Sequence, residues 1–192
     1  MKFIDKKTIK IDRELSELDN FTLDFIRILK KHTNYVLVSG YVSILLGRSR
    51  ASEDVDLIVP KMSFSSIESL YKDLVDHGFI CLNVDEVKTI FNYLEDELAV
   101  RFARRGKIIP NIEFKWVKNK FEEAALNNSI KVKLPEGYLK ISPLELQIAF
   151  KQEVLKSPKD LEDARHIEKI AENYLDNKLI DKYRESLREF YQ

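Results

Sequence analysis

The spacing of apolar residues predicts a helix followed by a strand, a short helix and a second strand. From residue 12 to 32 the apolar side chains recur at helical spacing. YVLVSG, residues 35–40, predicts a buried strand that ends in a tight turn, and YVSILLG, residues 41–47, predicts a short helix closed by its glycine. VDLIVP, residues 55–60, predicts a second strand that ends at its proline.

The middle of the chain predicts a second long helix and a third strand. Ser65 and Glu68 have the spacing of a capping box, which would start a helix that ends at His77. FICLNV then predicts a strand, and residues 85–95 predict another helix.

Beyond residue 141 the pattern becomes helical. Helix starts are predicted at Ser142-Pro143 and Ser157-Pro158, and a last helix over about 177–190. This order predicts an α+β fold, a small mixed sheet covered by helices on one face, with a C-terminal helical subdomain. The expected division is an N-terminal helix, an α/β core and the helical subdomain, at residues 1–34, 35–140 and 141–192.

Charge and cysteine content exclude several classes of protein. Basic and acidic residues number 32 each, and this zero net charge argues against broad nonspecific adhesion to nucleic acid, although a local basic patch can still bind it. One cysteine, Cys81, excludes an internal disulfide and a cysteine-based zinc site. No run approaches the ~18 apolar residues of a membrane span, and the N-terminus lacks a signal peptide's apolar core. We therefore expect a cytoplasmic protein with no membrane partner.

Two aspartates, Asp54 and Asp56, lie two residues apart at the start of a predicted strand, so both side chains leave the same face. Two carboxylates at one point repel each other unless a cation lies between them, and Mg²⁺ prefers oxygen ligands with room for phosphates and water. The small pair Ser39-Gly40 follows a buried strand and would let the backbone approach a phosphate. Aspartate is common in turns, so SEDVD as a plain loop is the alternative.

A third acid lies in a hairpin predicted from residues 97–103 and 108–117. In NIEFKWV, alternation places the apolar residues on one face and Glu113 with Lys115 on the other. If this strand lies beside VDLIV, Glu113 faces the same side as the two aspartates, and the three acids form a metal site for phosphoryl transfer. The alternative is that Glu113 simply faces solvent.

The segment YVLVSGYVSILLGRSRASEDVDLIV resembles the opening signature of the nucleotidyltransferase superfamily, and it looks most like the AbiEii/AbiGii toxin-type proteins. Ser39-Gly40 matches the small pair of that signature, and RASEDVDL matches the run that ends in Asp-x-Asp. SPLELQIAFKQEVLKSPKDLEDARHIE resembles the family's helical segment, in which Lys151 matches a lysine and Asp160 an aspartate. The similarity spans roughly residues 35–168.

The resemblance implies a Mg²⁺- or Mn²⁺-dependent enzyme that moves a nucleoside monophosphate from a nucleoside triphosphate to an acceptor hydroxyl. Asp54 and Asp56 would hold the metal, and Glu113 would ligate it or accept a proton. The residues that would bind the nucleotide are Ser39, Gly40, Arg50, Lys151 and Asp160. The acceptor would be RNA, a protein or a small molecule, and a toxin of this type would have an antitoxin protein as its partner. The alternative is a non-catalytic nucleotide- or partner-binding protein on the same fold.

Several positions keep more than one interpretation. Ser39 stands where the family has glycine, and Tyr41, where a small hydroxyl residue is usual, would narrow the nucleotide pocket or stack on a base. Asp160 also suits the third position of a helix capped by Ser157, and Lys151 also suits the solvent edge of an apolar stripe.

Residues 100–120 hold seven basic side chains and one acid, the largest local charge imbalance that we find in the sequence. The basic hairpin 101–107 is therefore either a solvated turn or a landing surface for RNA, whose binding is dominated by phosphate contacts.

Overall fold

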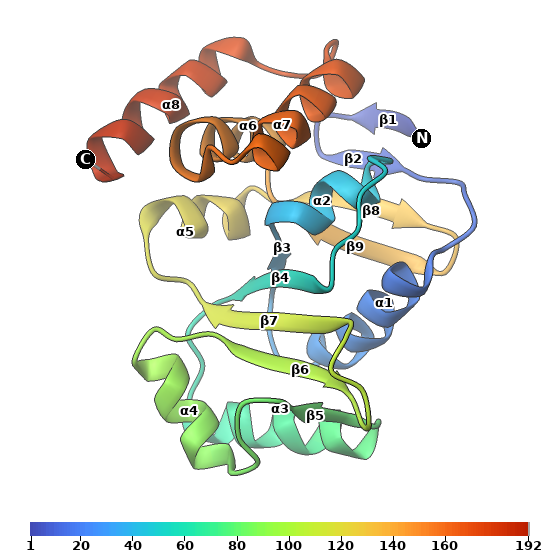
Figure 1. Cartoon of the computed structure of the whole chain (residues 1–192), viewed down its shortest axis with the longest axis vertical. Coiled ribbons are helices and arrows are strands. Elements are labelled where there is room, and N and C mark those ends of the chain that lie inside the picture. The colour runs from blue at the N-terminus through green and yellow to red at the C-terminus, as the bar shows by residue number, and fades with distance from the viewer. Residues whose placement is uncertain (192) are drawn as a thin grey trace.

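The computed structural model describes residues 1–191, in which nine strands form one mixed sheet (Figure 1). β4 lies near the middle, antiparallel to β3 and parallel to β7, and β6 and β5 continue antiparallel from β7. This mixed sheet with its surrounding helices confirms the α+β expectation. Across the sheet the strands are β1 (Lys2–Asp5), β2 (Thr8–Lys10), β8 (Ile130–Leu134), β9 (Gly137–Ile141), β3 (Val36–Leu37), β4 (Asp54–Val59), β7 (Asn111–Trp116), β6 (Val100–Arg104) and β5 (Phe79–Cys81).

The sheet is larger than the small one expected from the sequence. β1, β2, β8 and β9 lie in segments for which we predicted no strand, so residues 1–34 hold two strands besides the predicted helix. In β8 buried apolar residues alternate with the exposed Lys131 and Lys133, which is the two-residue period of a strand.

Helices cover both faces of the sheet, not one. α1 (Glu17–Leu29), α3 (Phe64–Asp76) and α4 (Val87–Glu95) contribute to the larger core on one face. On the other face, Val36 and Ile58 pack against α5 (Lys120–Asn127), α6 (Leu144–Phe150) and α8 (Asn177–Tyr191). The expectation of one covered face was wrong because apolar residues such as Ile58, only 3% exposed, also occupy the second face.

The remaining helices connect the sheet to the C-terminal part of the chain. α2 (Ser39–Leu45) begins earlier than predicted and contacts β4. From α6 the chain passes through one π-helical turn, η1 (Lys151–Leu155), into α7 (Pro158–Ala171), which contacts α2. Figure 1 shows α6, α7 and α8 gathered above α2 and α5. These three are the helices predicted for the C-terminal part of the chain. None of the described helices is both long and apolar enough to cross a membrane.

α3 begins at a different serine from the predicted one. Ser63 is its N-cap, and the Ser66 backbone N–H donates to the Ser63 hydroxyl over 3.3 Å. The predicted capping box of Ser65 and Glu68 was wrong because the helix already starts at Phe64.

Tyr41 connects α2 to α1 through a buried hydrogen bond. Its side chain is fully buried, and its hydroxyl donates to Asp19 Oδ1 over 2.9 Å. Burial alone would raise the pKa of Asp19, but hydrogen bonds from Arg13, Ser16 and Tyr41 together hold this pKa below its usual value. Tyr41 therefore neither narrows a nucleotide pocket nor stacks on a base, because it points into the core.

We expect Tyr41→Phe to destabilise the fold, because it leaves a buried carboxylate with one donor fewer. The cost should be about 1–3 kcal/mol, which lowers the melting temperature by about 2–4 °C per kcal/mol. Thermal unfolding at neutral pH measures it. Tyr93→Phe, which removes a hydroxyl from a partly buried ring on α4, is the matched control. Equal melting temperatures for the two variants would contradict a stabilising role for this hydrogen bond.

Candidate functional site

The two aspartates lie on β4 with apolar residues between them. Val55, Leu57 and Val59 are fully buried in the larger core, whereas Asp54 and Asp56 are partly exposed on the opposite face. This is the alternation of a strand with one face in the core. The prediction that both carboxylates leave the same face is therefore confirmed for the backbone geometry. The last three residues of SEDVD belong to β4, and only Ser52 and Glu53 precede the strand.

β7 brings Glu113 beside this pair. β4 and β7 are parallel neighbours, and their register places Asp54 opposite Asn111 and Asp56 opposite Glu113. Residues directly opposite each other in adjacent strands point to the same face. The condition set by the sequence, that the two strands lie side by side, is met, so three carboxylates share one region of the sheet.

Glu113 is also paired with a cation. Arg101 of the neighbouring strand β6 donates from Nη2 to Glu113 Oε2 over 3.1 Å. Among residues 1–191 no three His, Cys, Asp or Glu side chains lie close enough together to form a metal cage by themselves. Asp54 and Asp56 are the carboxylates that could hold a cation here, and phosphate and water would have to supply the remaining ligands.

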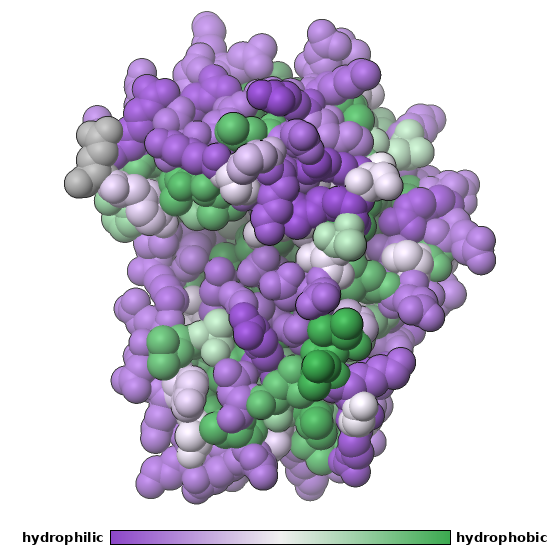
Figure 2. Space-filling model, in the orientation of Figure 1, coloured by the Kyte–Doolittle hydropathy of each residue, from purple (hydrophilic) through white to green (hydrophobic). Residues whose placement is uncertain are grey.

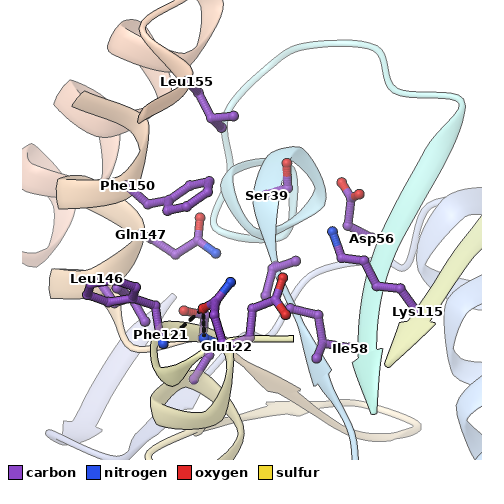
Figure 3. A pocket seen from close by; sticks show the side chains of 14 residues that line it. Ser39, Asp56, Ile58, Lys115, Phe121, Glu122, Leu146, Gln147, Phe150 and Leu155 are labelled. Atoms are coloured by element: carbon purple, nitrogen blue, oxygen red, sulfur yellow. Dashed lines mark hydrogen bonds between the residues drawn. The ribbon is translucent and has the colours of Figure 1, made fainter. Parts of the chain in front are cut away.

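The carboxyl group of Asp56 has a perturbed pKa. Burial raises its pKa above the usual value, and the neighbouring Glu113 and Asp54 raise it further. Lys115 and a hydrogen bond from the Ser39 hydroxyl act in the opposite direction. Figure 3 shows the Lys115 amine and Ser39 directed toward the Asp56 carboxylate. A carboxylate held in this way gains from any additional cation that binds beside it.

Ser39 occupies a strained backbone position at the start of α2. Its φ is 62°, in the left-handed region that costs a residue other than glycine about 1–2 kcal/mol. This conformation places the Ser39 hydroxyl beside the Asp56 carboxylate. Backbone strain of this kind is typical of functional sites.

Arg50 lies directly over Gly40. A Cβ atom added at Gly40 would stand 3.0 Å from Arg50 Nη2, so the guanidinium group would have to shift slightly to make room for it. Asp163 of α7 holds that group, since Arg50 Nη1 donates to Asp163 Oδ2 over 2.6 Å. Ser52 in the same loop donates to Asp54 Oδ1 over 3.1 Å. The loop between α2 and β4 is thus attached to α7 through Arg50 and to the first aspartate through Ser52.

Lys151 and Asp160 lie together in a buried ion-pair cluster. Lys151 is fully buried, and its Nζ donates to Asp160 Oδ1 over 3.1 Å and to Asp163 Oδ2 over 2.8 Å. Arg48 also pairs with Asp163. Lys151 therefore does not lie at the solvent edge of an apolar stripe, because its ammonium group donates to two carboxylates in the interior. The contact with phosphate that the resemblance implies stays a prediction.

Asp160 lies in the capped first turn of α7. Ser157 caps α7, with the Asp160 backbone N–H donating to the Ser157 hydroxyl over 3.3 Å, and Pro158 follows as the first residue of the helix. Burial would raise the pKa of Asp160, but hydrogen bonds from Ser157 and Lys151 lower it below the usual value. Of the two interpretations that the sequence left open, the capping position is the one that the structure shows.

Two hollows flank the aspartates, one beside each. The apolar hollow, of about 260 Å³, lies between β4 and the C-terminal helices (Figure 3). The charged hollow, of about 430 Å³, adjoins Asp54, whereas the apolar hollow adjoins Asp56. The lining of the apolar hollow includes Asp56, Ser39, Lys115 and Ile58 on the sheet side and Phe121, Leu146, Gln147 and Phe150 on the helices. The lining of the charged hollow includes Arg50, Ser52, Glu53, Asp54, Arg101, Asn111 and Lys159.

The basic hairpin 101–107 carries less free charge than its sequence indicates. Arg101 pairs with Glu113, and Arg104 pairs with Asp24 while its guanidinium lies 4.1 Å from the centroid of a phenylalanine ring. Arg105 and Lys107 are the hairpin cations left for a ligand. The turn also exposes Ile108, at 72%, and its neighbour Ile109. Figure 2 shows hydrophobic side chains gathered low on the face where Figure 1 shows β6 and β7.

Sequence reasoning missed two residues that shape the site. Lys115 is two residues from Glu113, so the same alternation that selected the glutamate could have selected the lysine. Asp163 follows Asp160 by three residues on α7 and therefore lies on the same side of the helix. Its link to Arg50 joins segments far apart in the sequence, and no local pattern signals that.

Comparisons with solved structures identify the fold. The crystal structure of ANT(2")-Ia in complex with adenylyl-2"-tobramycin is similar over 90% of this chain and 98% of that chain, with 14% identity and a TM-score of 0.56. An antigenic nucleotidyltransferase-like protein from Paracoccidioides brasiliensis is similar over 91% of this chain and 89% of its own, with 15% identity and a TM-score of 0.51. JHP933 from Helicobacter pylori has 18% identity over 86% of this chain and 72% of its own, with a TM-score of 0.50. The chain has a nucleotidyltransferase-like fold.

No protein-family model matches the chain, and no curated protein is significantly similar to it. The resemblance to AbiEii/AbiGii toxin-type proteins therefore stays a prediction from the sequence.

We expect Asp56→Asn to stabilise the metal-free protein. Because the native pKa of Asp56 is raised, its charge disfavours the folded state once the pH exceeds the unfolded value of about 3.9, and this penalty grows until the pH passes the native pKa. The variant should melt above the wild type at pH 7, by about 2–4 °C per kcal/mol relieved, and the difference should shrink as the pH falls toward about 4.

Thermal unfolding across pH measures the effect, with Glu53→Gln as the same change at an exposed neighbour. Saturating Mn²⁺ should raise the melting temperature of the wild type more than that of Asp56→Asn. A variant that melts at or below the wild type at pH 7 would contradict the account of Asp56.

Proposed function

We propose that this protein is a divalent-metal-dependent nucleotidyltransferase that moves a nucleoside monophosphate from a nucleoside triphosphate to an acceptor hydroxyl. The observation that carries the proposal is the register of β4 and β7, which sets Asp56 opposite Glu113 beside Asp54 and between two hollows. The nucleotidyltransferase-like fold supports it.

The residues present fit a hard divalent cation. Asp54 and Asp56 offer oxygen ligands from one strand face, and the raised pKa of Asp56 reflects burial and neighbouring acids that a cation would compensate. Bound there, Mg²⁺ or Mn²⁺ would supply charge stabilisation for the phosphates in the transition state. The protein's own contribution is to position the nucleotide and to handle the proton.

In the proposed reaction the acceptor hydroxyl oxygen bonds to the α-phosphorus, the bond from that phosphorus to the β-phosphate bridging oxygen breaks, and pyrophosphate leaves. Glu113 accepts the proton of the hydroxyl, while Arg101 holds one of its oxygens. Arg50 and the turn at Ser39-Gly40 orient the phosphates between the two hollows. The apolar hollow, with Gln147 as a polar group, suits the base.

The direct test is incubation of the pure protein with each α-labelled nucleoside triphosphate, Mg²⁺ or Mn²⁺, and three acceptor pools: total RNA, total protein and an aminoglycoside mixture. We include the aminoglycosides because the similar ANT(2")-Ia structure holds an adenylylated tobramycin. Label should appear in one pool with the wild type and fall at least about 100-fold with Asp54→Ala/Asp56→Ala.

Glu172→Ala/Glu189→Ala, which removes two exposed carboxylates from the C-terminal helical part, is the control and should label as the wild type does. Undiminished transfer by the Asp54→Ala/Asp56→Ala protein would overturn the site. Metal-dependent triphosphate binding without transfer to any pool would favour the second candidate, a non-catalytic nucleotide-binding protein. The serine at the position where the family has glycine, and the pairing of Glu113 with Arg101, favour that candidate.

The resemblance to AbiEii/AbiGii proteins supports a finer proposal, that the chain is the toxin of a toxin–antitoxin pair and is neutralised by an antitoxin protein. Induced expression in a bacterial host should then slow growth, and Asp56→Ala should restore it. Growth inhibition by both proteins alike would contradict the toxin role.

We also expect Gly40→Ala to weaken nucleotide binding with little cost in stability. The added methyl group would meet only the end of the flexible Arg50 side chain, which can move away from its place over the turn. Arg50→Ala should weaken binding by a similar factor of about 5–30, and the double variant should be no worse than either single one. Titration of a non-hydrolysable triphosphate measures this. Additive losses in the double variant would show that Gly40 does not act through Arg50.

A further inference from the structure

The outward face of β1, β2, β8 and β9 is covered by lysines. The strand register places Lys2 opposite Lys10 and Lys10 opposite Lys133, while Lys131 lies opposite Lys140. These five side chains share one face because opposed residues in neighbouring strands point the same way. The buried residues of the same strands, such as Ile9, Val132 and Leu139, point into the core on the other face. We call these five lysines, with Thr8 and Tyr138, the lysine face.

Stability of the sheet does not explain this arrangement. Like charges directly opposite each other in adjacent strands are destabilising, and the lysine face contains three such contacts. The acidic residues nearest to the lysine face in the sequence mostly interact with other groups. Asp5 accepts a hydrogen bond from a backbone N–H in its turn, and Glu136 pairs with Arg27. Asp12 lies 4.0 Å from Lys10 at an exposed position, where an ion pair contributes little.

An aromatic ring and a hollow adjoin the lysines. Tyr138 lies opposite Lys133 on the lysine face, and the amines of Lys131 and Lys30 lie 4.1 Å and 5.8 Å from its ring centroid. Beside it is an open hollow of about 460 Å³ whose lining includes Lys30, Lys31, Tyr35, Tyr138 and Lys140. Several ammonium groups and a ring therefore converge on one place.

Tyr35 adds a donor to the wall of this hollow. Its side chain is 2% exposed, and its hydroxyl has no hydrogen-bond partner among the described residues. Burial raises the pKa of this phenol well above the usual value, so it keeps its proton. A buried polar group without a partner costs free energy until one is supplied.

We propose that the lysine face and its adjoining hollow bind single-stranded nucleic acid, with the lysines on the phosphates and Tyr138 against a base. A positively charged surface that follows the backbone, combined with an aromatic ring for stacking, is how proteins hold single strands without sequence preference. A base that stacks on Tyr138 replaces the Lys131 amine on the ring and brings its phosphate beside that amine. The outward positions of β2, β8 and β9, in residues 8–10, 130–134 and 137–141, carry no aliphatic side chain, which disfavours a lipid surface as the partner.

This surface goes beyond the proposed transfer reaction and does not depend on it. It also differs from the basic hairpin 101–107, where two of the arginines are paired with acids. Among the described residues the lysine face holds more cations without a salt bridge than the hairpin does, since only Lys10 of its five lysines has one. Its members are too far apart in the sequence to form a charged run.

The test is fluorescence anisotropy with a labelled 12-nucleotide oligouridylate and its deoxy counterpart, titrated at several salt concentrations. The wild type should bind at low salt in the range of about 10⁻⁶ to 10⁻⁴ M. Lys131→Gln/Lys133→Gln should reduce the slope of log affinity against log salt by about 1.4, since each single-strand phosphate contact contributes about 0.7. Tyr138→Ala should weaken binding about tenfold, and Tyr138→Phe should retain it.

The matched control is Lys178→Gln/Lys182→Gln, the same charge change at exposed lysines on α8, which should bind as the wild type does. The Asp54→Ala/Asp56→Ala protein should also bind the oligonucleotide normally, so loss of transfer and loss of this surface are separate outcomes. No binding by the wild type at low salt, or equal losses in the Lys131→Gln/Lys133→Gln variant and its control, would overturn the proposal. So would binding to phosphatidylserine vesicles without binding to either oligonucleotide.

Discussion

The pairing of β4 with β7 is the constraint on which the rest of the site depends. β4 is buried on one face and carries Asp54 and Asp56 on the other, so a slip of one residue would drive both carboxylates into the core. The buried residues of the two strands therefore fix the register, and the register fixes Glu113 opposite Asp56. The packing that stabilises the sheet and the geometry that gathers the acids are consequences of the same alternation.

A second constraint connects the C-terminal helices to that strand. Asp163 on α7 is fully buried and contacts Lys151, Arg48 and Arg50, and Arg50 in turn lies over Gly40 at the start of α2. Removing one member of such a cluster leaves an uncompensated buried charge, which costs about 3–5 kcal/mol. Lys151 and Asp160, which the sequence resemblance links to nucleotide binding, lie together in the interior beside Asp163, the residue that holds Arg50.

The sequence predicted the local parts of this arrangement well and the long-range parts poorly. Period-two alternation was enough to place Asp54 and Asp56 on one face of a strand and Glu113 on the polar face of another, and the hairpin of β6 and β7 followed from its turn. The burial of Lys151 could not be predicted, because it depends on Asp163 and on a π-helical turn that shifts the helix phase. Strands β1 and β2 were missed because they are only four and three residues long, too short for a period to stand out, whereas the alternation of β8 was present in the sequence and was overlooked. Tyr41 illustrates the same limit, since only the fold shows that its hydroxyl meets a buried aspartate on α1.

The central claim is that Asp54 and Asp56 bind a divalent cation together with a nucleotide, on the open part of the face formed by β4 and β7. The most direct measurement is paramagnetic broadening of the assigned backbone amide signals by substoichiometric Mn²⁺ in the presence of a non-hydrolysable nucleoside triphosphate. The account predicts that signals at Ser39, Asp54–Asp56 and Glu113 broaden first in the wild type and stay sharp in the Asp54→Ala/Asp56→Ala protein. Broadening centred elsewhere, or the same broadening in both proteins, would contradict it.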